Sequence, residues 1–242
     1  MIGCDCGVCR STDPRDTRSR PSIALEFADG FRVLVDTTPD LRAQALRHDL
    51  RRVDAILFTH SHADHLMGLD EVRRYNMLAR APMPVFGQAS TLADLRRTFA
   101  YIFESEAPKG GGVPDLRLFP IAGAFCLGGA VIQPVPLVHG PWTILGYRVG
   151  RFAYLTDCNA IPESSLALLE GLDCLVLDAL RRRPHPTHFT LDEAVAMARR
   201  IGAARTFFTH MAHDLGHAET CAALPAGLTL AHDGLTLDVE TA

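Results

Sequence analysis

Four side chains that could bind a metal fall within six consecutive residues of this chain, His60-Ser61-His62-Ala63-Asp64-His65. Imidazole nitrogens and carboxylate oxygens are ligands that zinc, manganese and iron accept in proteins. The apolar run 55–59 before them is typical of a buried strand. The segment 66–79 after them favours a helix. The cluster is therefore expected on a tight turn where a strand ends, with its side chains directed toward one point.

A second group with metal-ligand spacing is the C-x-C-x-x-C run of Cys4, Cys6 and Cys9. In a reducing compartment this spacing favours a metal site over a disulfide framework. Three thiolates need a fourth ligand to close a tetrahedral zinc site. No neighbouring residue supplies one, so the fourth must come from far along the chain. The other cysteines have apolar surroundings and are expected to be reduced core residues: Cys126, Cys158, Cys174 and Cys221.

Strand-like runs in the second half of the chain also end at metal-binding residue types. Runs 130–138, 152–156 and 205–209 lead to His139, Asp157 and His210, respectively. Two more carboxylates follow apolar runs, Asp36 after 31–35 and Asp178 after 172–177. Such carboxylates could hold histidine rings in place from behind a metal site, or they could simply end their strands.

The remaining elements are marked by turn and capping residues. Asp29-Gly30 and Asp233-Gly234 each separate two strand-like runs and predict hairpins, 22–27 with 31–35 and 228–230 with 235–239. A capping box at Thr190 opens a helix that ends at Gly202. The Gly/Pro-rich stretch 108–114 is either a lid over the site or a plain surface connection. There is no linker or break in composition, so residues 1–242 are predicted to form one domain.

Composition narrows the classes of function. The chain has 242 residues, is 48% hydrophobic and carries a net charge of −4, which gives no basic footprint for nucleic acid apart from the local run 181–183. No apolar run approaches the roughly 18 residues of a membrane helix. The N-terminal residues lack the basic and then apolar pattern of a signal peptide. These features favour a cytoplasmic protein.

The hexad at 60–65 resembles the signature of the metallo-β-lactamase fold. The resemblance implies an α/β (α+β) fold, a four-layer αββα sandwich of two mixed β-sheets with helices outside, and a hydrolase with two divalent ions (Zn, Mn or Fe). Two such cations about 3.5–4 Å apart hold a bridging hydroxide and polarise a substrate oxygen. The resemblance also implies which residues bind the two ions. His60, His62 and His139 would bind the first ion, Asp64, His65 and His210 the second, and Asp157 would bind both.

The cysteine triplet makes the resemblance narrower. It is similar to that of the phosphoribosyl cyclic phosphodiesterase family of the carbon–phosphorus lyase pathway. This implies that His213 is the fourth ligand of a structural zinc, and that His188 protonates the leaving group. Histidine suits that task because its pKa lies near the working pH; His185 is a rival for the same role.

This chain departs from that family at its start. Members begin with a strand and a Gly-rich turn before the first cysteine, whereas here Cys4 follows only three residues. We therefore expect that the first family strand is missing before residue 1. An unpaired neighbouring strand would expose an edge that invites association, such as a homodimer.

The leading interpretation is a metal-dependent phosphodiesterase for a small phosphate ester, for example a cyclic one. The bridging hydroxide would attack phosphorus in line, and His188 would protonate the departing alkoxide. Alternatives are a hydrolase of a lactone, thioester or β-lactam, an RNA-processing nuclease, which the acidic balance disfavours, and a zinc-stapled binding module without activity. Replacing Asp64 by Ala distinguishes an enzyme from a binding module without activity. An enzyme would lose activity and keep its fold, whereas a protein that needs the site for its structure would lose both.

Overall fold

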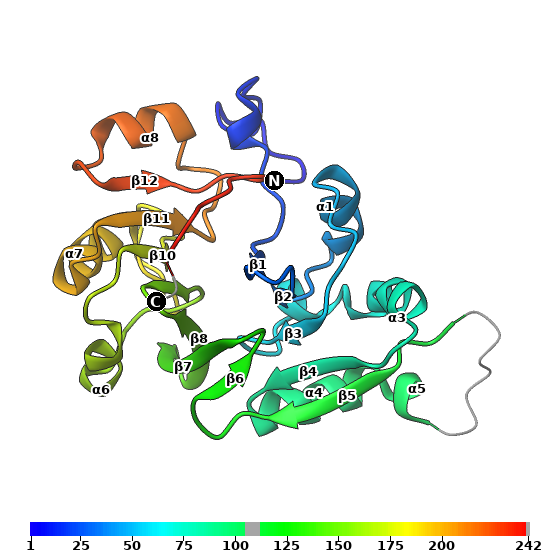
Figure 1. Cartoon of the computed structure of the whole chain (residues 1–242). Coiled ribbons are helices and arrows are strands. Elements are labelled where there is room, and N and C mark those ends of the chain that lie inside the picture. The colour runs from blue at the N-terminus through cyan, green and yellow to red at the C-terminus, as the bar shows by residue number, and fades with distance from the viewer. Residues whose placement is uncertain (105–111, 241–242) are drawn as a thin grey trace. The chain divides into compact units, whose positions relative to one another are not determined.

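The computed structural model describes residues 1–104 and 112–240, which form two compact units. One unit joins Met1–Ser19 to Ala130–Ala242, and the other is Arg20–Gly129. Each contains a mixed sheet with its own helices (Figure 1), so the predicted fold class of two mixed sheets with helices is confirmed. That all 242 residues form one domain stays a prediction. The stretch predicted as a lid or connection lies largely outside the described residues.

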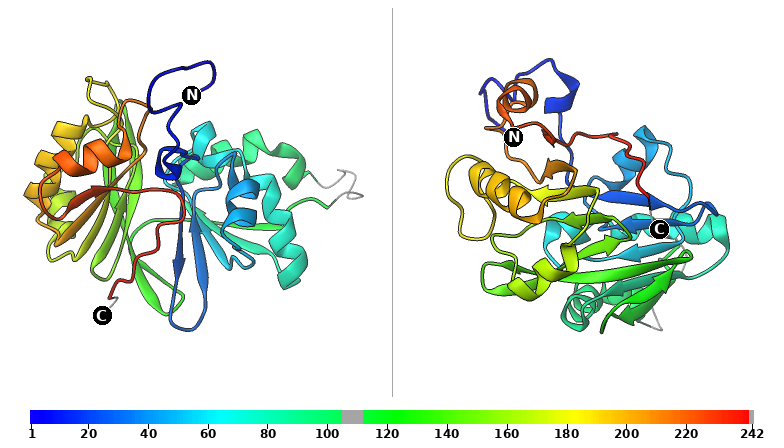
Figure 2. Two further views of the ribbon diagram at one scale, coloured as in Figure 1. Left: turned by 90° about the horizontal axis from the view of Figure 1, so that it is seen from above. Right: turned by 60° about the vertical axis from the view of Figure 1, so that its left-hand side comes forward.

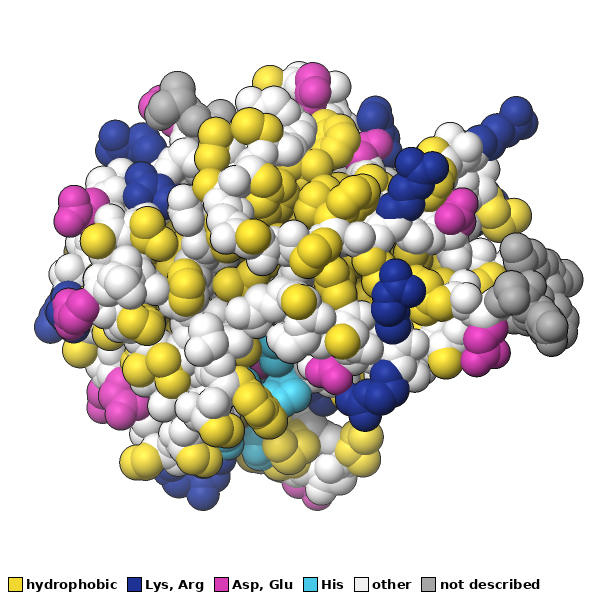
Figure 3. Space-filling model, turned by 90° about the horizontal axis from the view of Figure 1, so that it is seen from below, with side chains coloured by type: hydrophobic (Ala, Val, Ile, Leu, Met, Phe, Trp, Pro, Cys, Tyr) yellow, Lys and Arg dark blue, Asp and Glu magenta, His cyan; other side chains and the backbone are white. Residues whose placement is uncertain are grey.

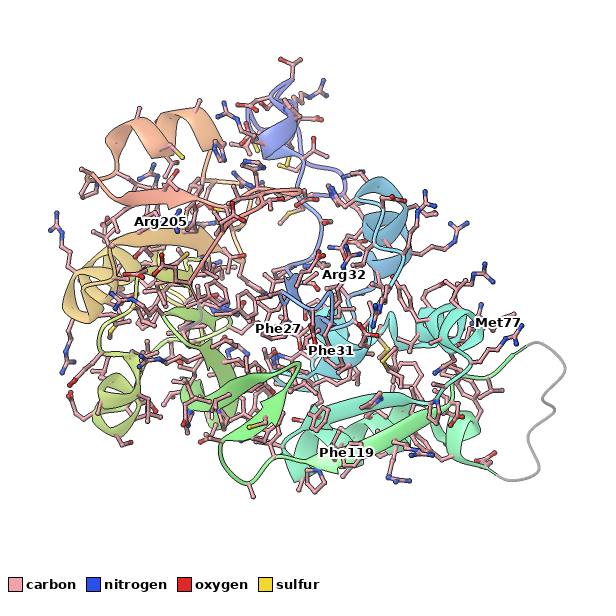
Figure 4. All side chains as sticks on the ribbon, viewed as in Figure 1. Phe27, Phe31, Arg32, Met77, Phe119 and Arg205 are labelled. Carbon is pink, nitrogen blue, oxygen red and sulfur yellow. The ribbon has the colours of Figure 1, made fainter. Side chains whose placement is uncertain are left out.

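The Arg20–Gly129 unit begins with the predicted hairpin. Strand β1 (Ile23–Glu26) pairs antiparallel with β2 (Arg32–Val35), and Gly30 in the turn has φ +79°, which glycine adopts without strain. Figure 4 shows Phe27 and Phe31 close together beyond the strand ends. The sheet then continues in parallel, in the order β1-β2-β3-β4-β5, through β3 (Ala55–Leu57), β4 (Met83–Gly87) and β5 (Leu116–Pro120).

Helices pack on this sheet through a buried apolar cluster that includes Leu41, Leu66, Val85 and Leu95. They are α1 (Leu41–Arg47), α2 (Ala63–Leu66), α3 (Arg73–Ala79), α4 (Ala89–Thr98) and α5 (Ala100–Phe103). The short strand β6 (Phe125–Leu127) follows them in the chain.

The helix predicted over 66–79 is broken into α2, the 3₁₀ turn η2 (Leu69–Val72) and α3. Gly68 lies at the break. Its N–H donates to the Thr37 carbonyl at 2.9 Å, and a Cβ at this position would overlap the backbone oxygen of Thr38. The close approach of two backbones therefore needs glycine here and ends the helical ladder.

The unit formed by Met1–Ser19 and Ala130–Ala242 carries a sheet whose strands follow the order β12-β11-β10-β9-β8-β7. Strands β7 (Ala130–His139), β8 (Trp142–Val149) and β9 (Phe152–Leu155) form an antiparallel meander. Strands β10 (Cys174–Asp178), β11 (Arg205–Thr209) and β12 (Leu228–Leu230) continue from β9 in parallel. Parallel strand ends meet at one edge, which places Asp157, Asp178 and His210 near one another.

Helices connect the parallel strands of this unit. They are α6 (Glu163–Leu166) with the 3₁₀ turn η4 (Ala167–Leu169), α7 (Leu191–Ile201) and α8 (His217–Ala223), and Figure 2 shows the yellow and orange helices together on one side of their strands. The predicted capping box is present, with Glu193 N–H donating to the Thr190 hydroxyl and the Glu193 carboxylate accepting from Thr190 N–H. Gly202 ends α7 in the left-handed conformation, as predicted. Another 3₁₀ turn, η1 (Pro14–Asp16), lies in the N-terminal segment.

The hairpin predicted around Asp233-Gly234 is wrong. Strand β12 pairs in parallel with β11, and residues 235–239 form no strand. The turn itself exists, since Leu235 N–H donates to the His232 carbonyl at 3.1 Å. The residues after it are held instead by the Arg205 side chain, which donates to the Asp238 carbonyl at 3.0 Å. No helix of the described part of the chain has both the length and the apolar character needed to cross a bilayer.

Candidate metal centre

In the Arg20–Gly129 unit the four predicted hexad ligands lie together after β3, with His60 and His62 on the turn and Asp64 and His65 in the short helix α2. His65 is fully buried and His60 nearly so, and their ring centroids lie 4.3 Å apart. The His62 ring lies 4.6 Å from that of His60. The Asp64 carboxylate completes the group, 3.8 Å from His65 Nε2. Three imidazoles and a carboxylate thus converge on one place.

Asp36 holds two of these rings from behind. Its buried carboxylate accepts hydrogen bonds from the Thr59 N–H at 2.8 Å and the Thr59 hydroxyl at 2.7 Å, and lies 2.7 Å from His65 Nδ1. His60 Nδ1 lies 3.0 Å from the same Thr59 oxygen. Because Thr59 gives its hydroxyl proton to Asp36, His60 Nδ1 must donate to it. Both rings then direct Nε2 as the metal-binding atom.

Burial sets the electrostatics of Asp36. It raises the pKa of the carboxyl above its usual value, whereas His65 and the Thr59 donors act in the opposite direction. The contacts of Asp36 with Thr59 and His65 support the prediction that this carboxylate orients the hexad from behind.

The unit formed by Met1–Ser19 and Ala130–Ala242 carries three further predicted ligands. His139 is the last residue of β7, Asp157 lies two residues after β9, and His210 directly follows β11. His210 Nε2 lies 3.2 Å from the Asp157 carboxylate. Asp157 and His210 have φ values of +57° and +59°, and Asp36 has +66°. Non-glycine residues in this conformation carry strain of about 1–3 kcal/mol each and tend to occur at functional sites. The backbone is therefore bent sharply at two of the predicted ligands, Asp157 and His210, and at Asp36.

Backbone chemistry orients His139. Its Nδ1 lies 2.8 Å from the Thr187 carbonyl oxygen, which can only accept a hydrogen bond. Nδ1 therefore carries the proton, and Nε2 keeps a lone pair for a metal. The turn after His139 is pressed against the same loop, because a Cβ on Gly140 would lie 2.6 Å from the Thr187 methyl group. The Asn159 side chain accepts the Gly140 N–H at 2.8 Å.

His188 lies among these ligands. Its ring is stacked on that of His210 at 4.8 Å and lies 4.9 Å from that of His139. Its Nδ1 faces the buried Asp178 carboxylate at 3.2 Å, and Asp178 also accepts the N–H groups of Asp157 and Phe189. Burial raises the pKa of Asp178, and the bond from His188 opposes that shift.

The rival His185 is placed differently. Its Nδ1 accepts from the Thr187 N–H at 3.3 Å, and its ring lies 5.0 Å from that of His188. Burial lowers its pKa. His188 has a carboxylate behind it and the rings of two predicted ligands beside it, whereas His185 Nδ1 is used in a local turn.

The cysteine group closes with the predicted histidine. His213 Nδ1 lies 3.3 Å from Cys4 Sγ and 3.4 Å from Cys6 Sγ, and the four candidate ligand atoms, Cys9 included, lie within 4.8 Å of one another. Zinc bonds of about 2.3 Å to sulfur and about 2.0 Å to nitrogen place tetrahedral S and N ligands about 3.5 Å apart. The Cys9 N–H, followed by His213, lowers the pKa of Cys6 to about 6, which favours a thiolate. Donor type and spacing therefore fit zinc.

Several supporting groups were not predicted. The Thr59 hydroxyl contacts the His60 ring, and the Thr187 carbonyl contacts the His139 ring. A backbone carbonyl is common to every residue, so the second contact leaves no signal in the sequence. Cys126 is exposed, contrary to the expectation of a core residue, whereas Cys158 and Cys174 are buried and Cys221 is half-buried.

Comparisons with known proteins agree with this architecture. The Beta-lactamase superfamily domain matches residues 31–211. A solved structure described as "a New Diphosphatase from the PhnP Family" is 48% identical to this chain, with a TM-score of 0.92. The match covers 99% of this chain and 92% of that one. The structure of Zn²⁺-bound PqqB from Methylobacterium extorquens is 21% identical, with a TM-score of 0.77, and the match covers 98% of this chain and 95% of that one. At this identity the likeness shows a shared fold and no shared function.

Among curated proteins, the chain is 33% identical over 243 residues to an octanoyltransferase of Porphyromonas gingivalis, and the match covers 99% of this chain. The chain spans about half the length of that relative, 49%. Since the superfamily domain covers most of the chain and the PhnP-family protein matches nearly all of it, this chain belongs to the PhnP family of the beta-lactamase superfamily.

Proposed function

We propose that this chain is a metal-dependent hydrolase of small phosphate esters, of the phosphoric diester class. In this proposal the four hexad ligands of one unit and the three strand-end ligands of the other hold two divalent ions. His60, His62 and His139 serve one ion, Asp64, His65 and His210 the other, and Asp157 both. A third ion, zinc, is held by Cys4, Cys6, Cys9 and His213 and has a structural role.

The two ions, when bound, supply positive charge that activates water and stabilises an anionic transition state. The chain's own residues do the rest. Asp36 and the Thr187 carbonyl fix the proton on Nδ1 of His65 and His139. His188 gives a proton to the oxygen that leaves phosphorus as the bond to the attacking water oxygen forms. Asp178 keeps the His188 ring in place for that transfer.

The observation that carries this proposal is the position of His188 between two ligand rings with a buried carboxylate behind it. Hydrolysis of a phosphate ester expels an alkoxide, which is a poor leaving group unless it is protonated. A positioned acid contributes about 10²–10⁴-fold to such a step. A structural or sensory metal site would have no use for an acid there.

The relatives support the phosphate class. The PhnP-family neighbour is described as a diphosphatase, and both a diphosphate and a phosphodiester lose an oxygen leaving group from phosphorus. The P. gingivalis relative is named for acyl transfer, in a chain about twice as long. Carbon–oxygen and carbon–sulfur esters therefore remain the alternative substrates for the test.

We also propose a cytoplasmic location and a small-molecule substrate rather than nucleic acid, with a homodimer as the expected assembly. Figure 3 shows acidic side chains beside the basic ones on the face that it draws. The net charge of −4 likewise gives no overall basic footprint for a phosphate backbone.

The test is a paired assay of the metal-loaded protein. A five-membered cyclic phosphodiester and an open dinucleoside diphosphate are compared with a lactone and a thioester, each rate divided by its uncatalysed rate. We expect the larger acceleration for the phosphorus substrates. Faster relative turnover of the lactone or thioester would reject the phosphate assignment. Salt-sensitive RNA binding with RNA cleavage would favour a nuclease instead.

A further inference from the structure

Trp142 is the chain's single tryptophan, and its side chain is 54% exposed. Scattered surface hydrophobic residues are normal in proteins, so exposure alone says little. The position of this residue is informative. It is the first residue of β8 and pairs in register with His139, the last residue of β7, whose side chain is buried.

Trp142 therefore lies beside a predicted metal ligand. The two ring centroids are 6.1 Å apart, with their planes at 40°. On another side the His139 ring contacts His188, the proposed proton donor, at 4.9 Å. The tryptophan and the acid thus share one neighbour. One ring, that of His139, therefore separates Trp142 from the proposed proton donor.

The turn that carries Trp142 is held in place. Gly140 adopts φ +58°, its N–H donates to Asn159, and its Cα is packed against the Thr187 methyl group. The Thr187 carbonyl in turn accepts a hydrogen bond from His139 Nδ1. A ring presented by such a turn is preorganised, so a ligand that stacks on it loses little binding energy to ordering the protein.

We propose that Trp142 is a stacking platform for a planar base on the substrate, and that the natural substrate is therefore a nucleotide derivative cleaved at phosphorus. This rests on the proposed function. An indole face binds a nucleobase by stacking, worth about 1–3 kcal/mol per base on substitution by alanine. Trp142 acts in substrate selection and touches no reacting atom.

The single tryptophan allows a direct test, because the intrinsic tryptophan fluorescence of the protein comes from Trp142 alone. The zinc-loaded protein is titrated with adenosine 5′-monophosphate and, separately, with ribose 5-phosphate, which lacks the base. We expect saturable quenching by the first and none by the second. Equal quenching by both, or no saturable change with the nucleotide, would overturn the proposal.

Variants add a second readout. Calorimetric affinity for adenosine 5′-monophosphate should fall about 5- to 150-fold in Trp142→Ala, the equivalent of one lost stack, and much less in Trp142→Phe. The kcat/KM preference for a base-carrying diphosphate over a base-free one should fall by a similar factor, mainly through KM. Phe119→Ala removes another exposed aromatic ring, labelled in Figure 4, and is the matched control. An unchanged preference in Trp142→Ala would also overturn the proposal.

The fluorescence titration needs no turnover. Base-dependent quenching by a protein inactive on phosphorus substrates would refute the proposed function and leave the stacking site standing. Activity on phosphate esters without base-dependent quenching would overturn the stacking proposal and leave the proposed function standing.

Discussion

The Nδ1 atom of His188 lies 3.2 Å from a carboxylate oxygen of Asp178, which is fully buried. The same oxygen also accepts the backbone N–H of Asp157, a predicted metal ligand. One carboxylate therefore contacts both the proposed proton donor and a predicted metal ligand. This arrangement matches that of Asp36, which aligns His65 and, through Thr59, His60 in the other unit.

Replacing His188 should act on the leaving group. We expect His188→Ala to lower kcat/KM by about 10²–10⁴-fold for esters with alkoxide leaving groups. The loss should be much smaller for nitrophenolate leaving groups, which need no proton. His185→Ala is the control, and a loss of equal size there would transfer the role of proton donor to His185. Steady-state kinetics over a series of leaving groups makes the measurement.

Replacing Asp36 should weaken metal binding without removing a ligand. In Asp36→Asn the new NH₂ group would face donors from Thr59 and His65, so the His65 ring loses its anchor. We expect a 10- to 100-fold loss, roughly, in metal affinity. Asp54→Asn is the control, since Asp54 accepts only from Arg32 and Arg52 in the hydrogen bonds seen among the described residues. Equal affinity in the two variants would contradict the role given to Asp36.

Elemental analysis tests the cysteine site. Cys6→Ser should lose about one zinc per chain relative to wild type, because serine is a poor zinc ligand and three donors do not close a structural site. The remaining metal should stay bound. Cys126→Ser, at an exposed cysteine outside the cluster, should keep the wild-type content. Unchanged zinc in Cys6→Ser would show that the cysteines hold no metal.

Gly140→Ala should disturb the loop that orients His139. The substitution adds a methyl group 2.6 Å from that of Thr187 and forces alanine to φ +58°. Gly202→Ala has a similar φ, +73°, with nothing within 4 Å of the added carbon. Left-handed strain alone costs about 1–2 kcal/mol, and overpacking adds about 1–3 kcal/mol. Denaturant unfolding should therefore show a larger loss for Gly140→Ala, and only that variant should bind metal less tightly.

Alkaline conditions should test the core of the Arg20–Gly129 unit. Tyr75 is buried and donates to the Leu50 carbonyl at 2.9 Å, and burial raises its pKa from 10 to about 12. The folded state resists ionisation more than the unfolded state, so this contribution is fully present below pH 10 and is lost as pH rises toward 12. The free energy of unfolding should fall less steeply over this interval in Tyr75→Phe, measured by urea unfolding. The same dependence of unfolding free energy on pH in wild type and Tyr75→Phe would contradict this prediction.

Local signals predicted the elements whose partners are close in sequence. The Asp29-Gly30 hairpin and the Thr190 capping box are each specified within a few residues, and both formed as predicted. The Asp233-Gly234 signal produced its turn but no hairpin, because β12 found its partner in β11. The break at Gly68 likewise depends on Thr37 and Thr38, thirty positions earlier. A chain contact of this kind cannot be read from local pattern.

The site shows the same division. Residue type and strand-end position predicted that the four hexad side chains would lie together, and the resemblance pointed to His213 and His188. Sequence could not show that Thr187 orients His139, since a carbonyl is common to every residue. No sequence signal marks His217 as a buried residue, yet it is buried on α8, where its backbone N–H donates to Asp16. That burial follows from packing by the N-terminal segment, which no local pattern encodes.

The two-segment make-up of one unit has a consequence for biosynthesis. Cys4 and His213 are 209 positions apart, and a ribosome adds about 5–20 residues per second. The three thiols therefore leave the ribosome roughly 10–40 s before the histidine that completes their site. The Arg20–Gly129 unit is continuous and can fold in the interval, while the first nineteen residues wait. During that wait the three thiols lack their histidine partner, so oxidants and competing metals can act on the nascent chain before the four side chains have come together.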